Sequence, residues 1–155
     1  MTKNKYLSLF IILLITFSAS AIGGFTTTSF KEPWYSEIVL PSFNPPSWVF
    51  APVWTTLYIL MSIAIWRVWI KFFNTKILKI YFCHIFFNAA WSIIFFGFHL
   101  PFLALIDLLI IILFVLYLAR AYKKLEIVSF YFTIPYIFWI LYAFVLNLNI
   151  VILNN

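Results

Sequence analysis

The stretch from Trp34 to Tyr58, WYSEIVLPSFNPPSWVFAPVWTTLY, lies between two apolar segments, and the rest of the chain is arranged around it. It contains four prolines and three tryptophans, which is too many rigid and aromatic residues for a passive connector. Asn44 stands before Pro45 and Pro46, a pattern typical of a helix N-cap followed by proline in the first turn. We therefore expect a helix to begin there.

Aromatic residues occupy the first turns of this expected helix. Pro52 cannot donate a hydrogen bond to the carbonyl of Trp48, so these turns are predicted to be irregular or bent. Trp54 and Tyr58 lie one helical turn apart and share a face. We interpret these bent first turns, lined with aromatic rings, as a candidate ligand entrance.

The composition identifies the class of protein. Of the 155 residues, 66% are hydrophobic, 23% are aromatic and 9% are charged, and a water-soluble globule of this size cannot bury so many apolar atoms. Five apolar segments each have close to the roughly 20 residues that cross a bilayer as a helix. They run over about 6–25, 47–70, 77–98, 101–121 and 127–150. The prediction is an all-α membrane protein, one five-helix transmembrane domain over 1–155 with no soluble module.

The positive charges predict how the chain crosses the membrane. Most of them fall on the side of the N-terminus: Lys3, Lys5, Arg67, Lys71, Lys76, Lys79, Arg120, Lys123 and Lys124. Lys31 alone falls on the other side. Because positive residues favour the cytoplasmic side, the N-terminus is predicted inside and the C-terminus outside. This bias explains the net charge of +6, so we expect no nucleic-acid partner.

The first apolar segment allows two interpretations. Two lysines, an apolar run and Ala19-Ser20-Ala21 imitate a secretory signal peptide with its cleavage site. Alternatively, Ala19, Ser20, Gly23 and Gly24 are small residues that let membrane helices approach one another closely. We favour a retained helix, on the family resemblance given below.

Three polar residues within the apolar segments are candidates for special chemistry. His84 adjoins Cys83, but neighbouring residues diverge around a helix and no second histidine shares this face, so we expect no metal site. Cys83 is the only cysteine, which excludes an internal disulfide. Asp107 lies inside the fourth segment without a basic partner at the same depth, and an intramembrane carboxyl is a functional candidate by default. We expect it to be protonated or to accept a bond from a buried Trp, Tyr or Asn.

Two further helix faces carry polar and aromatic residues together. Asn88, Trp91, Ser92 and Phe95 share one face of the third segment, where the amide needs a partner. That partner could be a neighbouring helix or a ligand. The corresponding face of the fifth segment holds Tyr136, Trp139, Ala143 and Asn147. Small Ala143 beside large Trp139 leaves room for a flat guest or for a neighbouring helix.

Three motifs resemble those of the TspO/MBR family, the tryptophan-rich sensory proteins related to the mitochondrial translocator protein. They are PSFxPPxWVFxPVWTxLY over 41–58, NxxWSxxFFxxH over 88–99 and PYxxWxxxAxxLN over 135–147. Together they cover most of the chain in order and spacing. The resemblance implies five transmembrane helices, a long first loop capping a pocket, a retained first helix and a homodimer.

The resemblance also implies a ligand. Family members bind tetrapyrroles, notably protoporphyrin IX, and some are associated with its degradation in light. By motif position, the implied ligand-binding residues are Trp34, Tyr35, Pro45, Trp54, Tyr58, Asn88, Trp91, Ser92, Trp139 and Ala143. Trp54 and Trp139 are the candidates for catalysis. Phe43 departs from the pattern, because many relatives have tryptophan there.

Three functions follow as alternatives. The first is a tetrapyrrole-binding sensor or regulator in a bacterial cell membrane, and the second is a light-dependent porphyrin-degrading enzyme. The third is a transporter of porphyrins or other lipophiles. The sequence has no nucleophile–base pair, phosphate loop or metal cluster that would indicate ordinary catalysis. No cofactor is expected other than a porphyrin acting as ligand or substrate.

Overall fold

A computed structural model describes residues 1–2 and 4–154 of the chain. Its elements are α1 (Lys5–Phe30), α2 (Trp34–Glu37), α3 (Ser47–Phe72), α4 (Thr75–Ser92), the π-helical turn η1 (Ile93–Gly97), α5 (Pro101–Leu125) and α6 (Ile127–Leu153). Five helices are long and apolar enough to cross a membrane, α4 continuing through η1. The described residues contain no strand. The prediction of an all-α, five-helix membrane protein is therefore confirmed.

Side chains and proline mark where several helices begin. The Asn4 Oδ1 accepts the backbone N–H groups of Tyr6 and Leu7, at 3.1 and 3.0 Å. The Asn74 Oδ1 caps α4 in the same way, since short polar side chains satisfy the free N–H groups of a first turn. Pro101 begins α5 at a position where its missing N–H is not needed.

The predicted start of the second long helix is wrong. Asn44 does not cap a helix, and α3 begins at Ser47 with Pro46 as the extended residue before it (ψ 142°). The reason is that a proline disfavours the helical conformation of the residue before it, so Pro46 keeps Pro45 out of a helix. The helix is continuous through Pro52.

The first helix runs about one turn further than predicted, to Phe30, and threonines occupy its last turns. The hydroxyls of Thr26, Thr27 and Thr28 each donate to the carbonyl four residues earlier. This shortens the first loop to 31–46, and the loop contains the short helix α2. We call this segment the cap loop.

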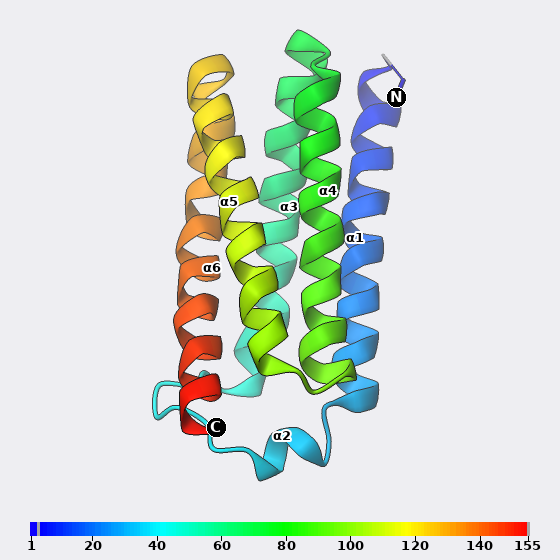
Figure 1. Ribbon diagram of the computed structural model, residues 1–155. Helices are drawn as coiled ribbons and strands as arrows, with labels where there is room; N and C mark the ends of the chain where they lie inside the picture. The colour runs from blue at the N-terminus through cyan, green and yellow to red at the C-terminus, as the bar shows by residue number, and fades with distance from the viewer. Residues whose placement is uncertain (3, 155) are drawn as a thin grey trace.

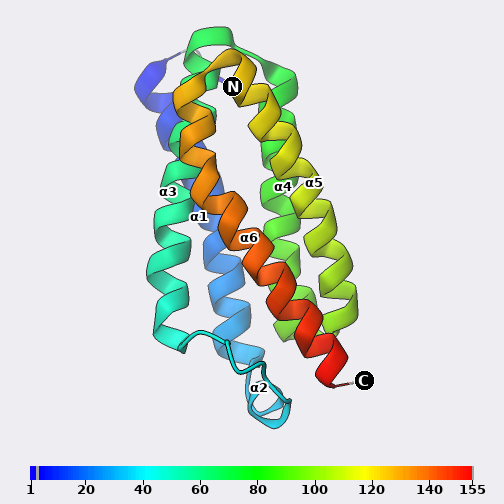
Figure 2. The same cartoon turned by 90° about the vertical axis from the view of Figure 1, so that its left-hand side faces the viewer.

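The five long helices form a closed ring. Contacts join α1 to α3 and α4, α3 to α6, α6 to α5, and α5 to α4. Figure 1 shows the helices side by side with the two termini at opposite ends of the bundle, and the cap loop crosses the end where the C-terminus lies. Figure 2 shows the same loop from the side. We call this end the cap end and the other the N-terminal end.

Buried polar side chains tie neighbouring helices together. The hydroxyls of Thr16 and Tyr81 are 2.8 Å apart and join α1 to α4. The Ser129 hydroxyl donates to the carbonyl of Ala64 and joins α6 to α3. Since lipid offers no hydrogen-bond partners, these bonds remove the penalty of placing polar groups there. Many large apolar side chains point outward instead, among them Phe10, Phe86, Leu113 and Phe138.

An ion-pair cluster fixes the N-terminal end. Glu126 is the single residue between α5 and α6, and its side chain is 5% exposed. Its carboxylate lies 2.5 Å from the Arg67 Nε and 3.3 Å from the Lys71 Nζ, both on α3. The bond from Arg67 lowers the pKa of Glu126 from 4.5 to about 2, and Lys71 adds to the effect. The α5–α6 turn is thereby held against α3.

Candidate functional site

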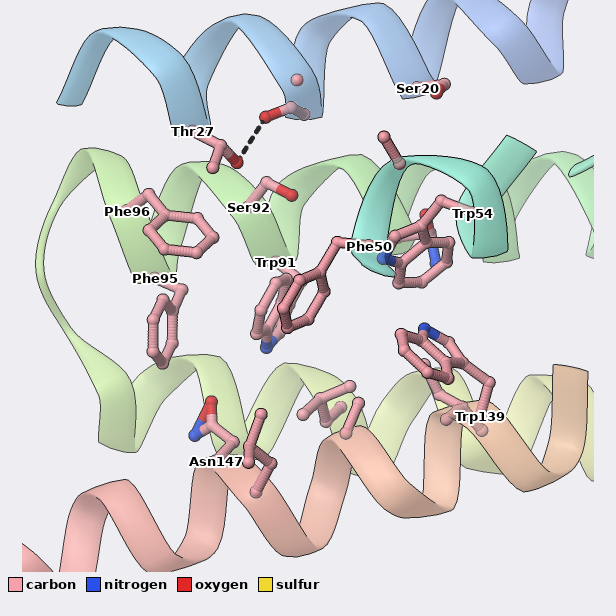
Figure 3. Close-up of a pocket in the computed structure, with 18 of the residues that line it drawn as sticks. Ser20, Thr27, Phe50, Trp54, Trp91, Ser92, Phe95, Phe96, Trp139 and Asn147 are labelled. Atoms are coloured by element: carbon pink, nitrogen blue, oxygen red, sulfur yellow. Dashed lines mark hydrogen bonds between the residues drawn. The ribbon is translucent and has the colours of Figure 1, made fainter. Parts of the chain in front are cut away.

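A cavity of about 420 Å³ lies within the cap end of the ring, within the range of about 300 to 1,000 Å³ usual for small-molecule sites. All five long helices and the cap loop contribute to its wall. Figure 3 shows side chains of several helices directed into it. The lining residues are Ser20, Gly23, Gly24, Thr27, Thr28, Lys31, Tyr35, Ser47, Phe50, Ala51, Trp54, Thr55, Tyr58, Asn88, Trp91, Ser92, Phe95, Phe96, Leu108, Ile111, Trp139, Ile140, Tyr142, Ala143, Leu146, Asn147 and Ile150.

Aromatic rings from α3 and α6 form one part of the wall. Trp54 stacks on Tyr58 at 5.3 Å between ring centroids, as their one-turn spacing requires. Trp54 also meets Trp139 at 6.4 Å, with the two ring planes nearly perpendicular. Phe50 contacts Trp139 as well, at 6.0 Å between ring centroids. Figure 3 shows the rings of Phe50, Trp54 and Trp139 facing the same space.

The end of α4 supplies a second aromatic group. Trp91 and Phe95 stack at 5.0 Å with an angle of 21° between their planes. The helix widens here into the π-turn η1, a distortion often found at functional sites. A side chain at Gly23 would lie only 3.0 Å from the Ser92 hydroxyl, so the glycine lets α1 come close to α4.

The floor of the cavity is polar, and its side chains bond to one another, although the buried Nδ1 of His84 has no partner among the described residues. The Tyr58 hydroxyl donates to the Asn88 Oδ1 at 2.5 Å, and the Asn88 Nδ2 donates to the Tyr136 hydroxyl at 2.9 Å. The His84 Nε2 lies 2.8 Å from that hydroxyl. Asn88 therefore lines the cavity and also joins α3, α4 and α6. The partner of this amide is thus found on neighbouring helices, and its role toward a ligand stays a prediction.

The cap loop covers the cavity with Tyr35 and Lys31. The Tyr35 hydroxyl donates to the Asn44 Oδ1 at 3.3 Å, and burial raises the pKa of Tyr35, which keeps it a neutral donor. The Lys31 ammonium lies 4.9 Å from the centre of the Tyr35 ring and 3.4 Å from the Glu32 carboxylate. The sequence has no other Lys or Arg between residues 6 and 66.

Three hydrogen bonds attach the cap loop to α6 and to Asn154, the residue that ends α6. The side-chain amide of Asn154 pairs with both backbone groups of Val39, accepting at 2.8 Å and donating at 2.9 Å. The Tyr142 hydroxyl donates to the carbonyl of Phe43 at 2.7 Å, and the two rings pack at 6.3 Å. The phenylalanine at 43 thus holds the loop rather than lining the cavity. The loop is thus anchored at two points, Val39 and Phe43. 

Eight of the ten residues predicted to bind a ligand line the cavity: Tyr35, Trp54, Tyr58, Asn88, Trp91, Ser92, Trp139 and Ala143. Trp34 and Pro45 do not line it. Trp34 stacks on His99 at 4.6 Å and packs against Phe95, so it holds α2 to the α4–α5 turn. Asp107 is 5% exposed and also outside the wall, and its Oδ2 has no hydrogen-bond partner among the described residues.

Sequence reasoning missed the contributions of α1 and α5 and several other side chains, among them Phe50, Lys31 and Asn147. Gly23 and Ser20 were interpreted only as positions of close helix approach, and they also border the cavity. Phe50 gave no signal within its apolar segment. Lys31 stood out as the lone cation beyond the first span, and Asn147 shared a face with Trp139. The isolated charge of Lys31 and the helix face that Asn147 shares with Trp139 were therefore signals that could have placed these two residues at the site.

The wall is chemically suited to binding rather than to hydrolysis. None of the described lining residues is His, Asp, Glu or Cys, so the wall offers no imidazole, carboxylate or thiol as base or nucleophile. It offers stacking surfaces, a few neutral polar groups and one cation. Such a site suits a flat apolar ligand with a small number of polar substituents.

Known proteins resemble the chain over most of its length. A model of the TspO/MBR family matches residues 10–153. The tryptophan-rich protein TspO of Archaeoglobus fulgidus is 33% identical over 95% of this chain and 94% of its own length. The tryptophan-rich sensory protein of Cereibacter sphaeroides is 34% identical, covering 92% and 91%. The translocator protein of Homo sapiens is 33% identical, covering 83% and 82%.

Proposed function

The chain belongs to the TspO/MBR family, as its motifs predicted, and on this premise we propose that it binds tetrapyrroles in the membrane. Protoporphyrin IX is the proposed ligand, and sensing or regulating its level is the proposed role. The observation that carries this proposal is the aromatic cavity with a single cation at its cap. Protoporphyrin IX is a flat, largely apolar ring system with two carboxylates on one edge, which matches these two features.

Stacking and charge each support this choice. Trp54, Trp91 and Trp139 present three indole surfaces within one cavity, and aromatic pairs contribute about 0.5 to 1.5 kcal/mol beyond their area. Lys31 lies where a carboxylate edge would reach the cap loop. The cavity floor, closed by Tyr58 and Asn88, sets the depth to which a ring can enter.

A titration in the dark tests the proposal. Protoporphyrin IX is added to the full-length protein in detergent while tryptophan fluorescence is followed. We expect saturable quenching, because three tryptophans border the cavity. Linear quenching equal to that of free tryptophan would contradict the proposal.

A second candidate function is light-dependent degradation of the bound porphyrin, favoured by the contact between Trp54 and Trp139 at 6.4 Å. Two indoles beside one ligand could supply electrons to an excited porphyrin in the presence of oxygen. Under illumination, we expect loss of porphyrin absorbance that Trp54→Phe and Trp139→Phe abolish while dark binding persists. Trp48→Phe is the control, because Trp48 is 75% exposed and lies outside the wall. Degradation at the normal rate in both cavity variants would exclude this role for the two indoles.

Transport of porphyrins or other lipophiles is the third candidate, and one feature bears on it. The cavity ends at a floor of buried, mutually bonded side chains, Tyr58, Asn88 and Tyr136, so passage to the other end would require that floor to open. Uptake into sealed liposomes tests it. Uptake equal to that of protein-free vesicles would exclude transport.

We further propose a bacterial cell-membrane location with the N-terminus inside, supported by the charge bias, and a homodimer, supported by the family. Reporter fusions at the two ends test the orientation. The mass of the protein in native nanodiscs tests the dimer.

A further inference from the structure

His84 is a buried base that does not line the ligand cavity. Its Nε2 lies 2.8 Å from the Tyr136 hydroxyl, which also accepts the amide of Asn88 at 2.9 Å. The imidazole of α4 and the phenol of α6 meet edge to face at 5.3 Å between ring centroids. Both residues are 1% exposed. A phenol and an imidazole are thus bonded to each other inside the core.

The bonding partners determine where the phenolic proton lies. The Tyr136 oxygen accepts from the Asn88 Nδ2, so its own proton is left for the His84 Nε2. The imidazole is then neutral with its proton on Nδ1, the ring nitrogen without a partner among the described residues. The opposite tautomer would leave two groups unbonded, the phenolic proton and the Nδ1 lone pair, and each unpaired buried group is costly. Tyr136 therefore donates to His84.

The other buried tyrosines have no such base. Tyr58 donates to an amide, and the Tyr81 hydroxyl is bonded to that of a threonine. The Tyr122 hydroxyl has no hydrogen-bond partner among the described residues. Amides and hydroxyls do not take up a proton at neutral pH, whereas a neutral imidazole does. Of the buried tyrosines in the described part of the chain, only Tyr136 can pass its proton to a base when it loses an electron.

Tyr136 also contacts the indoles of the cavity. Its ring lies 6.2 Å from that of Trp54, edge to face, and Trp54 lies 6.4 Å from Trp139. Figure 3 shows the two indoles facing the cavity. Electrons pass readily between aromatic rings in contact, so an indole that has lost an electron has a phenol beside it that can replace the electron.

We propose that Tyr136 and His84 form a redox pair that reduces an oxidised indole of the cavity. An electron passes from the Tyr136 ring to the Trp54 radical cation, the phenolic O–H bond breaks, and the proton binds to the His84 Nε2. The products are a neutral indole, a neutral tyrosyl radical and an imidazolium. The positive charge therefore moves from Trp54 to His84, and no new charge is created in the core.

The use of this pair in porphyrin chemistry rests on the second candidate function. There the oxidant is the light-excited porphyrin, and dioxygen is the final acceptor of its electron. The pair moves the unpaired electron from Trp54, beside the ligand, to Tyr136, which does not line the cavity. When an electron returns to the tyrosyl radical, the proton returns from His84 and the resting state is restored.

The pair can be tested without a porphyrin. A near-ultraviolet laser pulse removes electrons from tryptophan in the full-length protein in detergent, and the samples are frozen for electron paramagnetic resonance. We expect a tyrosyl radical to form as the tryptophan radical decays. Ring-deuterated tyrosine narrows that signal and identifies the radical as tyrosyl.

Variants assign the radical to the pair. Tyr136→Phe removes only the hydroxyl, so the tyrosyl signal should be lost and the tryptophan radical should last longer. His84→Gln keeps an acceptor for the phenol but cannot take up its proton, so the signal should be lost there too. Tyr81→Phe is the matched control, since Tyr81 is a buried phenol 6.2 Å from the His84 ring that bonds to Thr16 instead. It should give the wild-type signal.

Several results would overturn the proposal. They are the absence of a tyrosyl radical in the wild type, its persistence in Tyr136→Phe or His84→Gln, and an equal loss in Tyr81→Phe. If His84→Gln does not fold, heavy water decides, because the tryptophan radical should decay more slowly there when a proton moves with the electron. An equal decay rate in the two solvents would then overturn the pair.

The outcomes separate this inference from the porphyrin proposals. A laser-induced radical on Tyr136 that depends on His84, together with no porphyrin binding in the dark, would leave the pair standing and remove its proposed use. Porphyrin degradation that needs Trp54, in a protein that forms no radical on Tyr136, would overturn the pair and leave the second candidate function intact.

Discussion

Asn88 shows how one side chain can serve both the fold and the site. It is 5% exposed, accepts from Tyr58 on α3 and donates to Tyr136 on α6. An amide in this position must be paired because lipid and apolar side chains offer it nothing. The same pairing closes the floor of the cavity, so the depth of the cavity depends on a bond that also holds three helices together.

Replacing Asn88 with leucine should destabilise the protein by about 1 to 3 kcal/mol, because the Tyr58 hydroxyl loses its acceptor in a buried site. Thermal unfolding in detergent measures the change. Asn149→Leu, on the outer part of α6, should unfold at nearly the wild-type temperature. An equal shift for the two variants would show that the polar floor adds no stability.

Lys31 is the residue on which the charge argument depends. We expect Lys31→Met to weaken binding of protoporphyrin IX a few-fold, since an exposed ion pair contributes about 0.2 to 1 kcal/mol. The dimethyl ester of the porphyrin, which has no carboxylate, should bind the variant and the wild type equally. Lys76→Met, at the other end of the bundle, serves as the control. A loss of affinity for acid and ester alike would assign Lys31 a packing role.

At the scale of helices, the turn between α5 and α6 is held to α3 by one carboxylate. The pKa of Glu126 is lowered from 4.5 to about 2 by Arg67, with Lys71 adding to the effect. A carboxylate with a lowered pKa stabilises the folded state above its ordinary pKa, and the contribution is lost as the pH falls from about 4.5 to about 2.

Glu126→Gln should therefore lower stability at pH 7 by about 1 to 3 kcal/mol, less than a fully buried pair because Arg67 and Lys71 are partly exposed. Between pH 4.5 and pH 2 the wild type should lose this advantage and approach the variant. Melting temperatures over this pH range check the convergence. A constant gap would contradict the ionised pair, and Glu37→Gln, in exposed α2, controls for general acid effects.

The cap loop is a second test at this scale. Asn154 holds both backbone groups of Val39, so Asn154→Ala should increase hydrogen exchange in residues 31–46 while exchange in the long helices stays unchanged. The exchange is followed by mass spectrometry. Asn149→Ala, which removes an amide that bonds only within α6, should leave the loop as in the wild type. Unchanged exchange in Asn154→Ala would mean that Tyr142 and Phe43 suffice to hold the loop.

Local sequence rules predicted some helix ends and failed at others. The length and apolar character of the five helices could be read from the sequence because each must cross a bilayer. The helix start predicted at Asn44 was wrong. Proline is favoured in a first helical turn, but Pro46 also keeps the residue before it, Pro45, out of the helical conformation. The end of α1 at Phe30 was also missed, because threonine is not typical of helices and its hydroxyls here bond back to their own helix.

For the site too, features set by spacing within one helix could be predicted, whereas features set by packing between helices could not. Faces on α3, α4 and α6 were recognisable because spacing places Trp54, Asn88 and Trp139 on inward faces. The wall from α1 was not recognisable, since Gly23 has no side chain and its place at the cavity depends on the packing of α1 against α4. Trp34 shows the opposite case, because the motif position alone could not show that its ring turns toward His99.

At the scale of the whole molecule, the ring of five helices has two different ends. The N-terminal end is closed by ion pairs and buried hydroxyls, and the cap end encloses a cavity of about 420 Å³ beneath the cap loop. The lateral surface is rich in exposed apolar side chains suited to lipid. A lipophilic ligand in the surrounding bilayer would thus meet a site at one end of the bundle.

The measurement that tests the central claim most directly is porphyrin binding by a variant in which the cavity is filled. Ala143 lines the cavity beside Trp139, so Ala143→Trp would occupy its space. Val145→Trp is the matched control, because Val145 is 46% exposed on the outer surface of the same helix. Binding of protoporphyrin IX in the dark is followed by the shift in its own absorbance. Saturable binding that persists in Val145→Trp and is lost in Ala143→Trp is the predicted result, whereas equal binding by both variants would place the porphyrin elsewhere and contradict the account.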